Sequence, residues 1–338
     1  MDGRLYAPTA RNSAFPAPML AQPPATIERT LKSAIGCVGV GLHSGRKVTM
    51  NLHPAASGTG IVFRRTDVAG SRDIPARFAN VIDTRLCTVV AHPDQPLVGV
   101  GTIEHLMAAF VGCGVQNALV TVDGPELPIL DGSAASFLFL IDCAGTVEQS
   151  HNAAVIEILR TVRVTKGEAF AELRPSYMPG FEARLSIAFD AAAIGSQSIQ
   201  MRLTPETFRA ELARARTFTH ASEVAQLQAQ GLARGGSLAN AIVVDGDTVL
   251  NPGGLRMEGE FVRHKLLDAV GDLALAGAAL QGILVAHRPG HALNNRLLHA
   301  LFADDANWRP MRQEITVGAA PAMAGWQDAH MAAAASPF

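Results

Sequence analysis

The chain has 338 residues, of which 48% are hydrophobic and 17% charged, and its formal net charge is -2. This composition excludes a disordered chain, and the length favours two domains. With 28 Lys and Arg against 30 Asp and Glu, the chain lacks the basic excess of nucleic-acid binders, so we expect no nucleic-acid partner. The four cysteines are spread singly without a Cys-x-x-Cys pair. This spacing argues against a disulfide scaffold and favours a reducing, cytoplasmic location.

Both ends of the chain differ in composition from the part between them. Residues 1–25 hold Pro and Ala but no continuous apolar stretch after a basic start, so we expect a flexible arm rather than a secretory signal. Residues 311–338 are rich in Ala and lack periodicity, which indicates a second tail. The most apolar internal stretch, residues 273–286, is too short to cross a bilayer. We therefore expect no transmembrane segment.

The first domain is expected over residues 26–150 and mixes strands with helices. Alternating apolar and polar residues predict strands from Lys47 to His53 and from Ala118 to Val122. Between them, Thr102 is expected to cap a helix that ends at nearby glycines, and Ser133 to begin another. The apolar face of the helix after Thr102 consists of Ile103, Leu106, Met107, Phe110 and Val111.

The second domain is expected over residues 151–310 and repeats this style. In both halves a strong helix follows a set of strands, which predicts an α+β fold of two similar domains, each a sheet layered on helices, packed face to face. Its predicted strands are Ile156–Val164, Ala183–Phe189, Ala241–Val244 and Gly282–Ala286, the last of the chain, and its predicted helices are Pro205–Ala215, Gly259–Ala276 and Leu293–Phe302.

Three places concentrate reactive side chains, and the first is Glu104-His105 near the start of its helix. An acidic residue in the first turn stabilises the helix dipole, and a single histidine is more often structural than a ligand. No second histidine follows at the spacing of the His-Glu-x-x-His motif. From these residues alone, a structural and a functional role both stay open.

The second place is a helix face formed by His264, Asp268 and Asp272, which follow one another at intervals of four residues. Such a face is usually an exposed stripe of charges. Here the cations lie toward the helix N-terminus and the carboxylates further along, against both the helix dipole and the preferred order of helical ion pairs. Histidine and carboxylate one turn apart can chelate zinc or another divalent ion.

The third place is the turn Arg288-Pro289-Gly290-His291 between a strand and a helix, where functional groups often gather. The alternative is that His291 only packs near that helix. Together the three places supply two imidazoles and a carboxylate as ligands, a carboxylate base and an imidazole acid, which suits a catalytic zinc with one open position. The chain has no Gly-x-Ser-x-Gly elbow or P-loop, and residues 39–45 do not match the dinucleotide fingerprint.

Six motifs carry a resemblance to a known family. In chain order they are TIEHLMAAF, DGSAASF, ARTF, GLARGGSLANAIV, EFVRHKLLDAVGDL and GHALNN. From about Thr30 to Phe302 the chain resembles the UDP-3-O-acyl-N-acetylglucosamine deacetylases. The resemblance implies an active site between the two domains and a small inserted element in each. It also implies zinc-dependent removal of acetate from the acylated UDP-sugar, the committed step of lipid A biosynthesis and hence of lipopolysaccharide.

The resemblance further implies a role for each residue of the reaction centre. Glu104 would be the general base, and His291 the general acid with Asp272 as its partner. Thr217 would help hold the oxyanion through its hydroxyl. Whether Glu104 or His291 protonates the leaving amine stays open. The implied ligands of the zinc (Zn²⁺) are His105, His264 and Asp268.

Substrate binding is expected to involve four further side chains and an insert. Lys265 would place a cation near the diphosphate, and Arg288 is a weaker phosphate candidate. Phe218 would stack on the sugar and Glu223 would lie in the sugar-nucleotide pocket, although Phe218 could be core, and Glu223 and Arg288 plain surface. By resemblance, the insert at residues 219–237 would form the acyl passage. Its apolar residues are Val224, Leu227 and Leu232.

Two other functions stay open from the residues alone. One is a non-catalytic sugar-nucleotide or metal-binding protein on the same fold, which the presence of Glu104 and all implied ligands disfavours. The other is a zinc deacylase with a different substrate, which an assay of acylated and unacylated UDP-sugars would separate. We expect the protein to be a monomer.

Overall fold

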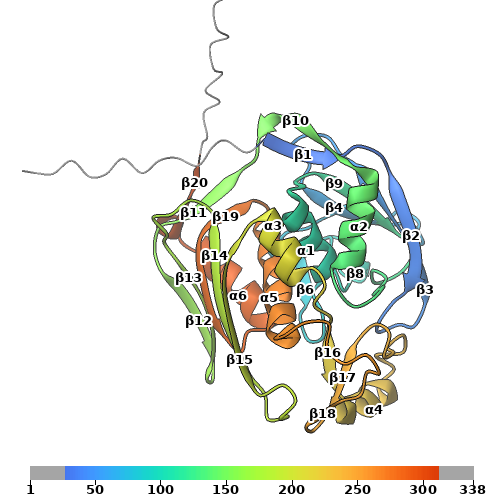
Figure 1. The fold of residues 1–338 in the computed structure, drawn as a ribbon. Coiled ribbons are helices and arrows are strands. Elements are labelled where there is room, and N and C mark those ends of the chain that lie inside the picture. The colour runs from blue at the N-terminus through green and yellow to red at the C-terminus, as the bar shows by residue number, and fades with distance from the viewer. Residues whose placement is uncertain (1–26, 312–338) are drawn as a thin grey trace, which may run out of the picture.

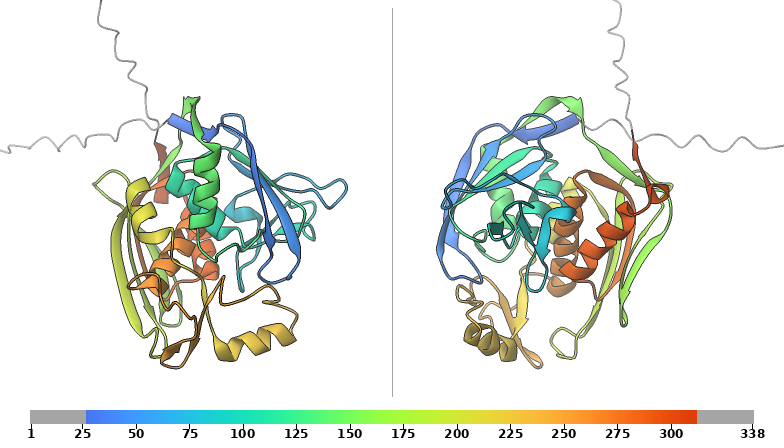
Figure 2. Two further views of the ribbon diagram at one scale, coloured as in Figure 1. Left: turned by 45° about the vertical axis from the view of Figure 1, so that its right-hand side comes forward. Right: turned by 180° about the vertical axis from the view of Figure 1, so that it is seen from behind.

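The computed structural model describes residues 27–311. The predicted N-terminal arm and the predicted C-terminal tail lie outside the described residues, except that Met311 ends the last strand, β20 (Trp308–Met311). Two large sheets form opposite sides of the molecule, and the main helices lie between them (Figures 1 and 2). Mixed α and β structure with sheets packed against helices confirms the expected α+β fold class.

The first sheet has five strands in the order β2-β3-β9-β4-β5. Its strand β3 (Lys47–Pro54) alternates buried and more exposed residues, as its sequence pattern predicts. It pairs antiparallel with β2 (Ile35–Val40) and β9 (Ala118–Val122), and β9 pairs parallel with β4 (Ile61–Arg65). The two edge strands are β2 and β5 (Ile74–Pro75). The sheet's inner face therefore presents a row of apolar side chains to the helices.

The second sheet has seven strands and is built around β19 (Ala279–His287). Parallel pairing of β19 with β14 and β11, and antiparallel pairing with β13, buries its middle. The strand β20 pairs antiparallel with β11. The other strands of this sheet are β11 (Val155–Ile158), β12 (Val162–Lys166), β13 (Ala169–Arg174), β14 (Phe181–Ala188), β15 (Ser196–Leu203) and β20 (Trp308–Met311).

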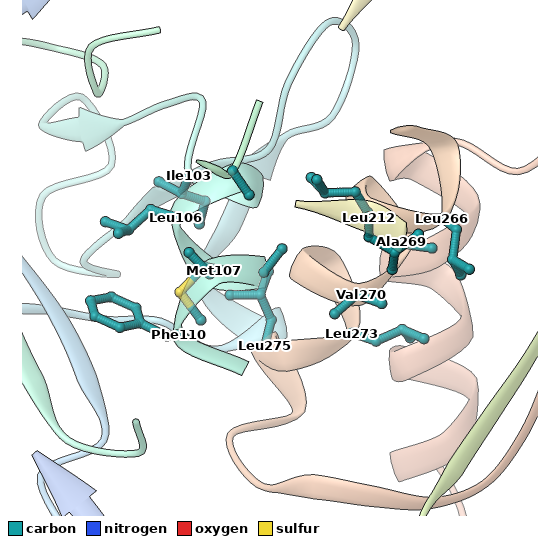
Figure 3. Close-up of a cluster of buried hydrophobic side chains, with 14 of the residues drawn as sticks. Ile103, Leu106, Met107, Phe110, Leu212, Leu266, Ala269, Val270, Leu273 and Leu275 are labelled. Carbon is teal, nitrogen blue, oxygen red and sulfur yellow. The ribbon is translucent and has the colours of Figure 1, made fainter. Parts of the chain in front are cut away.

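The helices α1 (Glu104–Cys113) and α5 (Glu260–Leu273) meet between the sheets. Figure 3 shows apolar side chains of both helices in the buried core. Burial of such side chains is the main favourable term in folding. The buried side chains of this core include Ile103, Leu106, Met107 and Phe110 on or next to α1, and Leu266, Ala269, Val270 and Leu273 on α5. The helices α2 (Ala135–Ala144) and α6 (His291–Phe302) pack beside α1 and α5 respectively.

Smaller elements surround this core. A three-stranded sheet consists of β6 (Val81–Asp83), β7 (Val89–Ala91) and β8 (Gly99–Val100). A second small unit lies below the large sheets in Figure 1. Its elements are β16 (Phe218–His220), α4 (Ala221–Ala229), β17 (Ile242–Asp245) and β18 (Thr248–Val249). The strand β1 (Ile27–Leu31) pairs with β10 (Thr146–Asn152). The remaining elements are the short helix α3 (Pro205–Thr207) and the short helical segments η1 (Phe78–Asn80), η2 (Phe208–Leu212), η3 (Ala274–Ala276) and η4 (Asp305–Asn307).

The predicted cap of α1 is wrong. Thr102 has a left-handed backbone (φ 56°), and the residue that precedes the helix is Ile103, which makes no side-chain cap. The Thr102 hydroxyl instead points toward the carboxylate of Glu126, with 3.4 Å between the oxygens. Val111, predicted on the buried face, is 37% exposed. The helix does end at a left-handed glycine, Gly114, as expected.

Three other predicted elements differ from the structure. The predicted strand Ile156–Val164 is two strands, because the backbone N–H of Leu159 donates to the carbonyl of Asn307 instead of continuing the ladder. The predicted helix Pro205–Ala215 is one α-helical turn followed by a π-helical segment. The strand β19 is not the last, since β20 follows it. Over residues 27–311, no helix is both long enough and apolar enough to span a bilayer.

Candidate metal centre

Three buried side chains from two helices converge where α1 meets α5. His105 comes from the first turn of α1, and His264 and Asp268 lie one turn apart on α5. The Oδ1 atom of Asp268 is 3.2 Å from Nε2 of His264 and 3.5 Å from Nε2 of His105. All three side chains are at least 95% buried. The structure therefore brings together the three residues implied as ligands.

Hydrogen bonding determines which nitrogen of His264 faces this cluster. Its Nδ1 lies 3.0 Å from the backbone carbonyl of Ala215, and a carbonyl only accepts, so Nδ1 carries the proton. Burial lowers the pKa of His264 to about 3, so the ring is neutral. Its Nε2 lone pair consequently faces the carboxylate oxygen of Asp268, which is buried and has no hydrogen-bond partner. Two electron-rich atoms held this close fit a divalent cation between them.

The second oxygen of Asp268 is occupied by Lys265. The Nζ of Lys265 donates to Oδ2 of Asp268 at 2.8 Å. Burial by itself would raise the pKa of Asp268, but the Lys265 ammonium in contact with this carboxylate helps to hold the pKa well below its usual range. Burial likewise disfavours the charge of Lys265, yet the contact with Asp268 raises the pKa of Lys265. Asp268 is thus an ionised carboxylate with one oxygen bound to the Lys265 ammonium and the other facing the two histidines, which suits a metal ligand.

An acid–base pair adjoins the metal cluster. Glu104 immediately precedes His105, and its Oε1 is 3.9 Å from Nε2 of His291, the first residue of α6. Burial raises the pKa of Glu104, although His291 and His105 act in the opposite direction. Burial would lower the pKa of His291, but the carboxylates of Asp272 and Glu104 outweigh it and raise the pKa to about 9. A base and a protonated imidazole therefore face each other beside the cluster.

The carboxylate of Asp272 orients the imidazole of His291. Nδ1 of His291 lies 2.9 Å from Oδ2 of Asp272, so Nε2 points toward Glu104. Two residues that sequence reasoning missed also bind this carboxylate. The hydroxyl of Thr88 donates to Oδ1 at 2.5 Å, and the amide of Asn294 donates to Oδ2 at 2.8 Å. Asn294 has a sequence signal, because it lies three residues after His291 on the same helix. Thr88 has none.

Thr217, the residue before β16, is held by backbone contacts to two other segments of the chain. Its N–H donates to the carbonyl of Gly132, and its carbonyl accepts from Ile242, both at 2.8 Å. A side chain at Gly132 would place its Cβ 1.9 Å from the carbonyl oxygen of Asn240, so only glycine fits there. The preceding residue, Arg216, forms a buried bidentate pair with Glu260 of α5.

Two cavities adjoin the small unit around α4, and Thr217 lines one of them. One, of about 460 Å³, is mainly apolar and is lined by Thr217, Phe218 and residues of the predicted insert. These insert residues include Val224, Leu227, Ala233 and Gly236. The other cavity, of about 420 Å³, lies on the far side of His43 and Leu86, and Leu232 lines it. The insert residues predicted to be apolar therefore line cavities rather than a closed core.

A third cavity, of about 450 Å³, is more polar and collects most of the predicted substrate-binding side chains. Lys265, Arg288 and Glu223 line it together with His220. Arg288 is exposed, and its guanidinium lies 3.4 Å from Glu168. Phe218 does not line this cavity. Its ring packs edge-on against Phe261, as a core residue would, while its other side lines the apolar cavity.

Buried imidazole and carboxylate ligands next to an acid–base pair are typical of metal-dependent hydrolases. The profile of the UDP-3-O-acyl N-acetylglycosamine deacetylases matches residues 28–303. The chain therefore belongs to this family of metalloenzymes.

Curated proteins named UDP-3-O-acyl-N-acetylglucosamine deacetylase are similar over most of the chain. The protein of Acidithiobacillus ferrooxidans is 47% identical over 283 residues, which are 83% of this chain and 91% of that protein. The protein of Pseudoalteromonas atlantica is 45% identical over 283 residues, covering 83% and 92%. The protein of Vibrio vulnificus is 44% identical over 299 residues, covering 88% and 97%. The family match over residues 28–303 thus includes the two large sheets, apart from β20, and the helices between them.

Proposed function

We propose that the chain hydrolyses the N-acetyl group of UDP-3-O-acyl-N-acetylglucosamine, releasing acetate and UDP-3-O-acyl-glucosamine in lipid A biosynthesis. The names of the similar proteins support this substrate. The observation that carries the reaction type is the position of Glu104 and His291 beside the His105–His264–Asp268 cluster. Amide hydrolysis needs an activated water, a base and an acid, and these residues suit all three tasks.

We propose zinc as the metal, held by His105, His264 and Asp268. Two imidazoles and one carboxylate are a ligand set of catalytic zinc enzymes. When bound, zinc supplies Lewis-acid polarisation of the amide carbonyl and lowers the pKa of water at the site. The carbonyl of Ala215 keeps Nε2 of His264 free to bind the metal, and Lys265 leaves Oδ1 of Asp268 free in the same way.

Glu104 would take the proton of the attacking water on its Oε1 atom. Its other oxygen, Oε2, accepts the backbone N–H of Thr88 at 3.1 Å, which leaves Oε1 directed toward His291. Burial raises the pKa of this carboxyl toward neutrality, where a general base is most effective. Glu104 would then hold the proton next to the leaving nitrogen.

His291 would donate a proton from Nε2 to the leaving amine. Its raised pKa, about 9, keeps the ring protonated near neutral pH. Asp272 holds the Nδ1 proton, so Nε2 is the nitrogen that faces the reaction. Glu104 could return its own proton instead, and the pH dependence of a His291 variant distinguishes the two donors.

The substrate would extend from the reaction centre into two of the cavities. The Thr217 hydroxyl would donate to the oxyanion. Lys265 and Arg288 would lie near the diphosphate in the polar cavity, with Glu223 at its edge. The acyl chain would occupy the apolar cavity of about 460 Å³, and the sugar would contact Phe218 at its border.

We further infer that residues 26–150 and 151–310 form the two domains, with the insert near residues 219–237, and that the protein acts as a cytoplasmic monomer. The two large sheets support this division, because each is built from strands of one half only. Sedimentation of the purified protein tests the monomer.

Product analysis tests the proposed function. The purified enzyme is incubated with UDP-3-O-acyl-N-acetylglucosamine and, separately, with unacylated UDP-N-acetylglucosamine. We expect acetate from the first substrate with its acyl ester intact, and far less from the second. Release of the fatty acid instead would identify a deacylase. Turnover of neither substrate by the zinc-loaded protein would reject the proposal.

A further inference from the structure

We propose that Thr88 is a positioning residue that fixes the general base and the partner of the general acid relative to each other. The inference rests on the proposed function, because it takes Glu104 and Asp272 in the roles given above. Thr88 lies in the segment between β6 and β7, is 2% exposed, and contacts both carboxylates.

The two contacts come from different parts of the residue. The backbone N–H of Thr88 donates to Oε2 of Glu104 at 3.1 Å, and its hydroxyl donates to Oδ1 of Asp272 at 2.5 Å. Glu104 belongs to α1 and Asp272 to α5, so one buried residue connects both helices to the small sheet. Hydrogen bonds to ionised groups are shorter and stronger than neutral ones. Thr88 therefore restrains both carboxylates at once.

The hydrogen bonds of Asp272 show why the Thr88 hydroxyl matters. Oδ2 accepts from His291 and Asn294, whereas Oδ1 accepts from Thr88. Without this hydroxyl, Oδ1 would be a buried charged oxygen lacking its donor, and the carboxylate would rotate to find another. Such a rotation would draw Oδ2 away from Nδ1 of His291. The imidazole would then lose the orientation that directs Nε2 toward Glu104.

Substrate binding should depend little on Thr88. Its neighbours Leu86 and Cys87 line the cavity of about 420 Å³, and their places depend on the backbone, which a change from threonine to valine keeps. Valine has nearly the shape of threonine and lacks only the hydroxyl. The variant Thr88→Val thus removes the contact with Asp272 and retains the backbone contact with Glu104.

Steady-state kinetics of the zinc-loaded enzyme test the proposal. We expect Thr88→Val to lower kcat by about 10- to 100-fold, the range for partners that orient reactive groups, with KM and metal content near those of wild type. Thr88→Ser should restore most of kcat, because it restores the hydroxyl. Thr30→Val is the matched control, since the buried hydroxyl of Thr30, in β1, donates to the carbonyl of Asn117, the residue before β9. Its kcat should equal that of wild type.

A double-mutant cycle separates positioning from general loss of structure. In an Asp272→Ala background the Thr88 hydroxyl has no carboxylate to hold, so adding Thr88→Val should change kcat by less than about threefold. If Thr88→Val lowered kcat by the same factor in the Asp272→Ala background as in wild type, the proposal would be overturned. A Thr88→Val enzyme with wild-type kcat, or with a change in KM alone, would also overturn it.

A readout without substrate distinguishes failure of this inference from failure of the proposed function. Proton NMR detects the Nδ1 proton of His291 as a downfield resonance when the bond to Asp272 is intact. We expect the resonance to shift upfield or vanish in Thr88→Val and to persist in Thr88→Ser and Thr30→Val. If wild type did not deacetylate the substrate, only the function would fail. An unchanged resonance in Thr88→Val would reject the role of Thr88.

Discussion

Gly271 of α5 lies directly against the backbone of Glu104 in α1. A Cβ atom at Gly271 would come within 2.0 Å of the carbonyl oxygen of Glu104 and 3.0 Å of its Cα. These Glu104 atoms belong to the helix backbone, so they cannot move aside as the end of a flexible side chain could. This close approach is what brings His105, on α1, within reach of His264 and Asp268, on α5.

The first prediction is that Gly271→Ala destabilises the protein and weakens the metal site. Alanine favours a helix by about 1 kcal/mol over glycine, so helix propensity alone predicts that the substitution stabilises the protein. We expect a loss of about 1–3 kcal/mol in the free energy of unfolding, because the helices must separate, together with lower metal affinity. Urea unfolding and metal titration measure both. Gly253→Ala is the control, since a Cβ there meets no atom within 4 Å. Equal stability of Gly271→Ala and wild type would contradict this packing.

The second prediction concerns the ligands. His105→Ala and Asp268→Ala should each remove the metal and the activity while the fold remains, because large apolar contacts hold α1 to α5. Elemental analysis measures the metal, and circular dichroism measures the fold. His151→Ala, at an exposed histidine of β10, should keep one metal ion per chain. Full occupancy in the His105 and Asp268 variants would refute the assignment.

The third prediction is a bell-shaped dependence of kcat/KM on pH. Glu104 must be ionised, so activity rises through its pKa, which burial raises above the ordinary carboxyl range. His291 must be protonated, so activity falls as pH rises through its pKa of about 9. The two limbs belong to the coupled site. His291→Ala should lose roughly 10²–10⁴-fold and flatten the basic limb. If the basic limb were unchanged in His291→Ala, it would belong to another group. Glu104 would then be the proton donor to the leaving amine.

Asp272→Asn is the companion test of the basic limb. The carboxylate of Asp272 is the largest favourable contribution to the raised pKa of His291. Its replacement by a neutral amide should therefore move the basic limb to lower pH, because the imidazolium loses its nearest negative charge. Glu104 remains in this variant, so its carboxylate still raises the pKa of His291 in part. An unmoved limb would show that Asp272 does not control His291.

The fourth prediction tests the apolar cavity. Each buried methylene supplies about 0.8 kcal/mol, or roughly fourfold in kcat/KM, so the acylated substrate should be strongly preferred. Ala233→Glu places a charge at the cavity wall and should reduce this preference. Ala225→Glu introduces the same charge on the exposed side of α4 and should not. Equal kcat/KM for acylated and unacylated substrates in wild type would show that the cavity does not hold the chain.

The fifth prediction concerns the buried pair that precedes Thr217. Glu260 accepts from the backbone and guanidinium of Arg216 and is fully buried. Glu260→Ala should cost about 3–5 kcal/mol in the free energy of unfolding, since it leaves the buried Arg216 guanidinium without its carboxylate partner. The exposed pair of Arg64 and Asp73 gives the comparison, and Asp73→Ala should cost less than about 1 kcal/mol. Similar losses in both variants would contradict this difference in burial.

Local pattern in the sequence predicted the elements that carry the site. The helical spacing of apolar residues after Ile103 predicted α1, and the face of His264, Asp268 and Asp272 was readable because four-residue intervals determine which side chains share a helix face. The cap at Thr102 was wrong because its conformation depends on Glu126, which belongs to a later segment. The two strands within Ile156–Val164 were missed because the break depends on Asn307, far along the chain.

By itself, the sequence determined the residue types of the site, their helical spacing and the family resemblance. Only the tertiary structure decided how His105 meets Asp268, which nitrogen of His264 is free, and that Thr88 binds Asp272 from 184 residues away. The physical reason is that helical periodicity is a local property of the backbone. Convergence and protonation instead depend on burial and on partners that chain folding brings from distant segments, and no short stretch of sequence contains both partners.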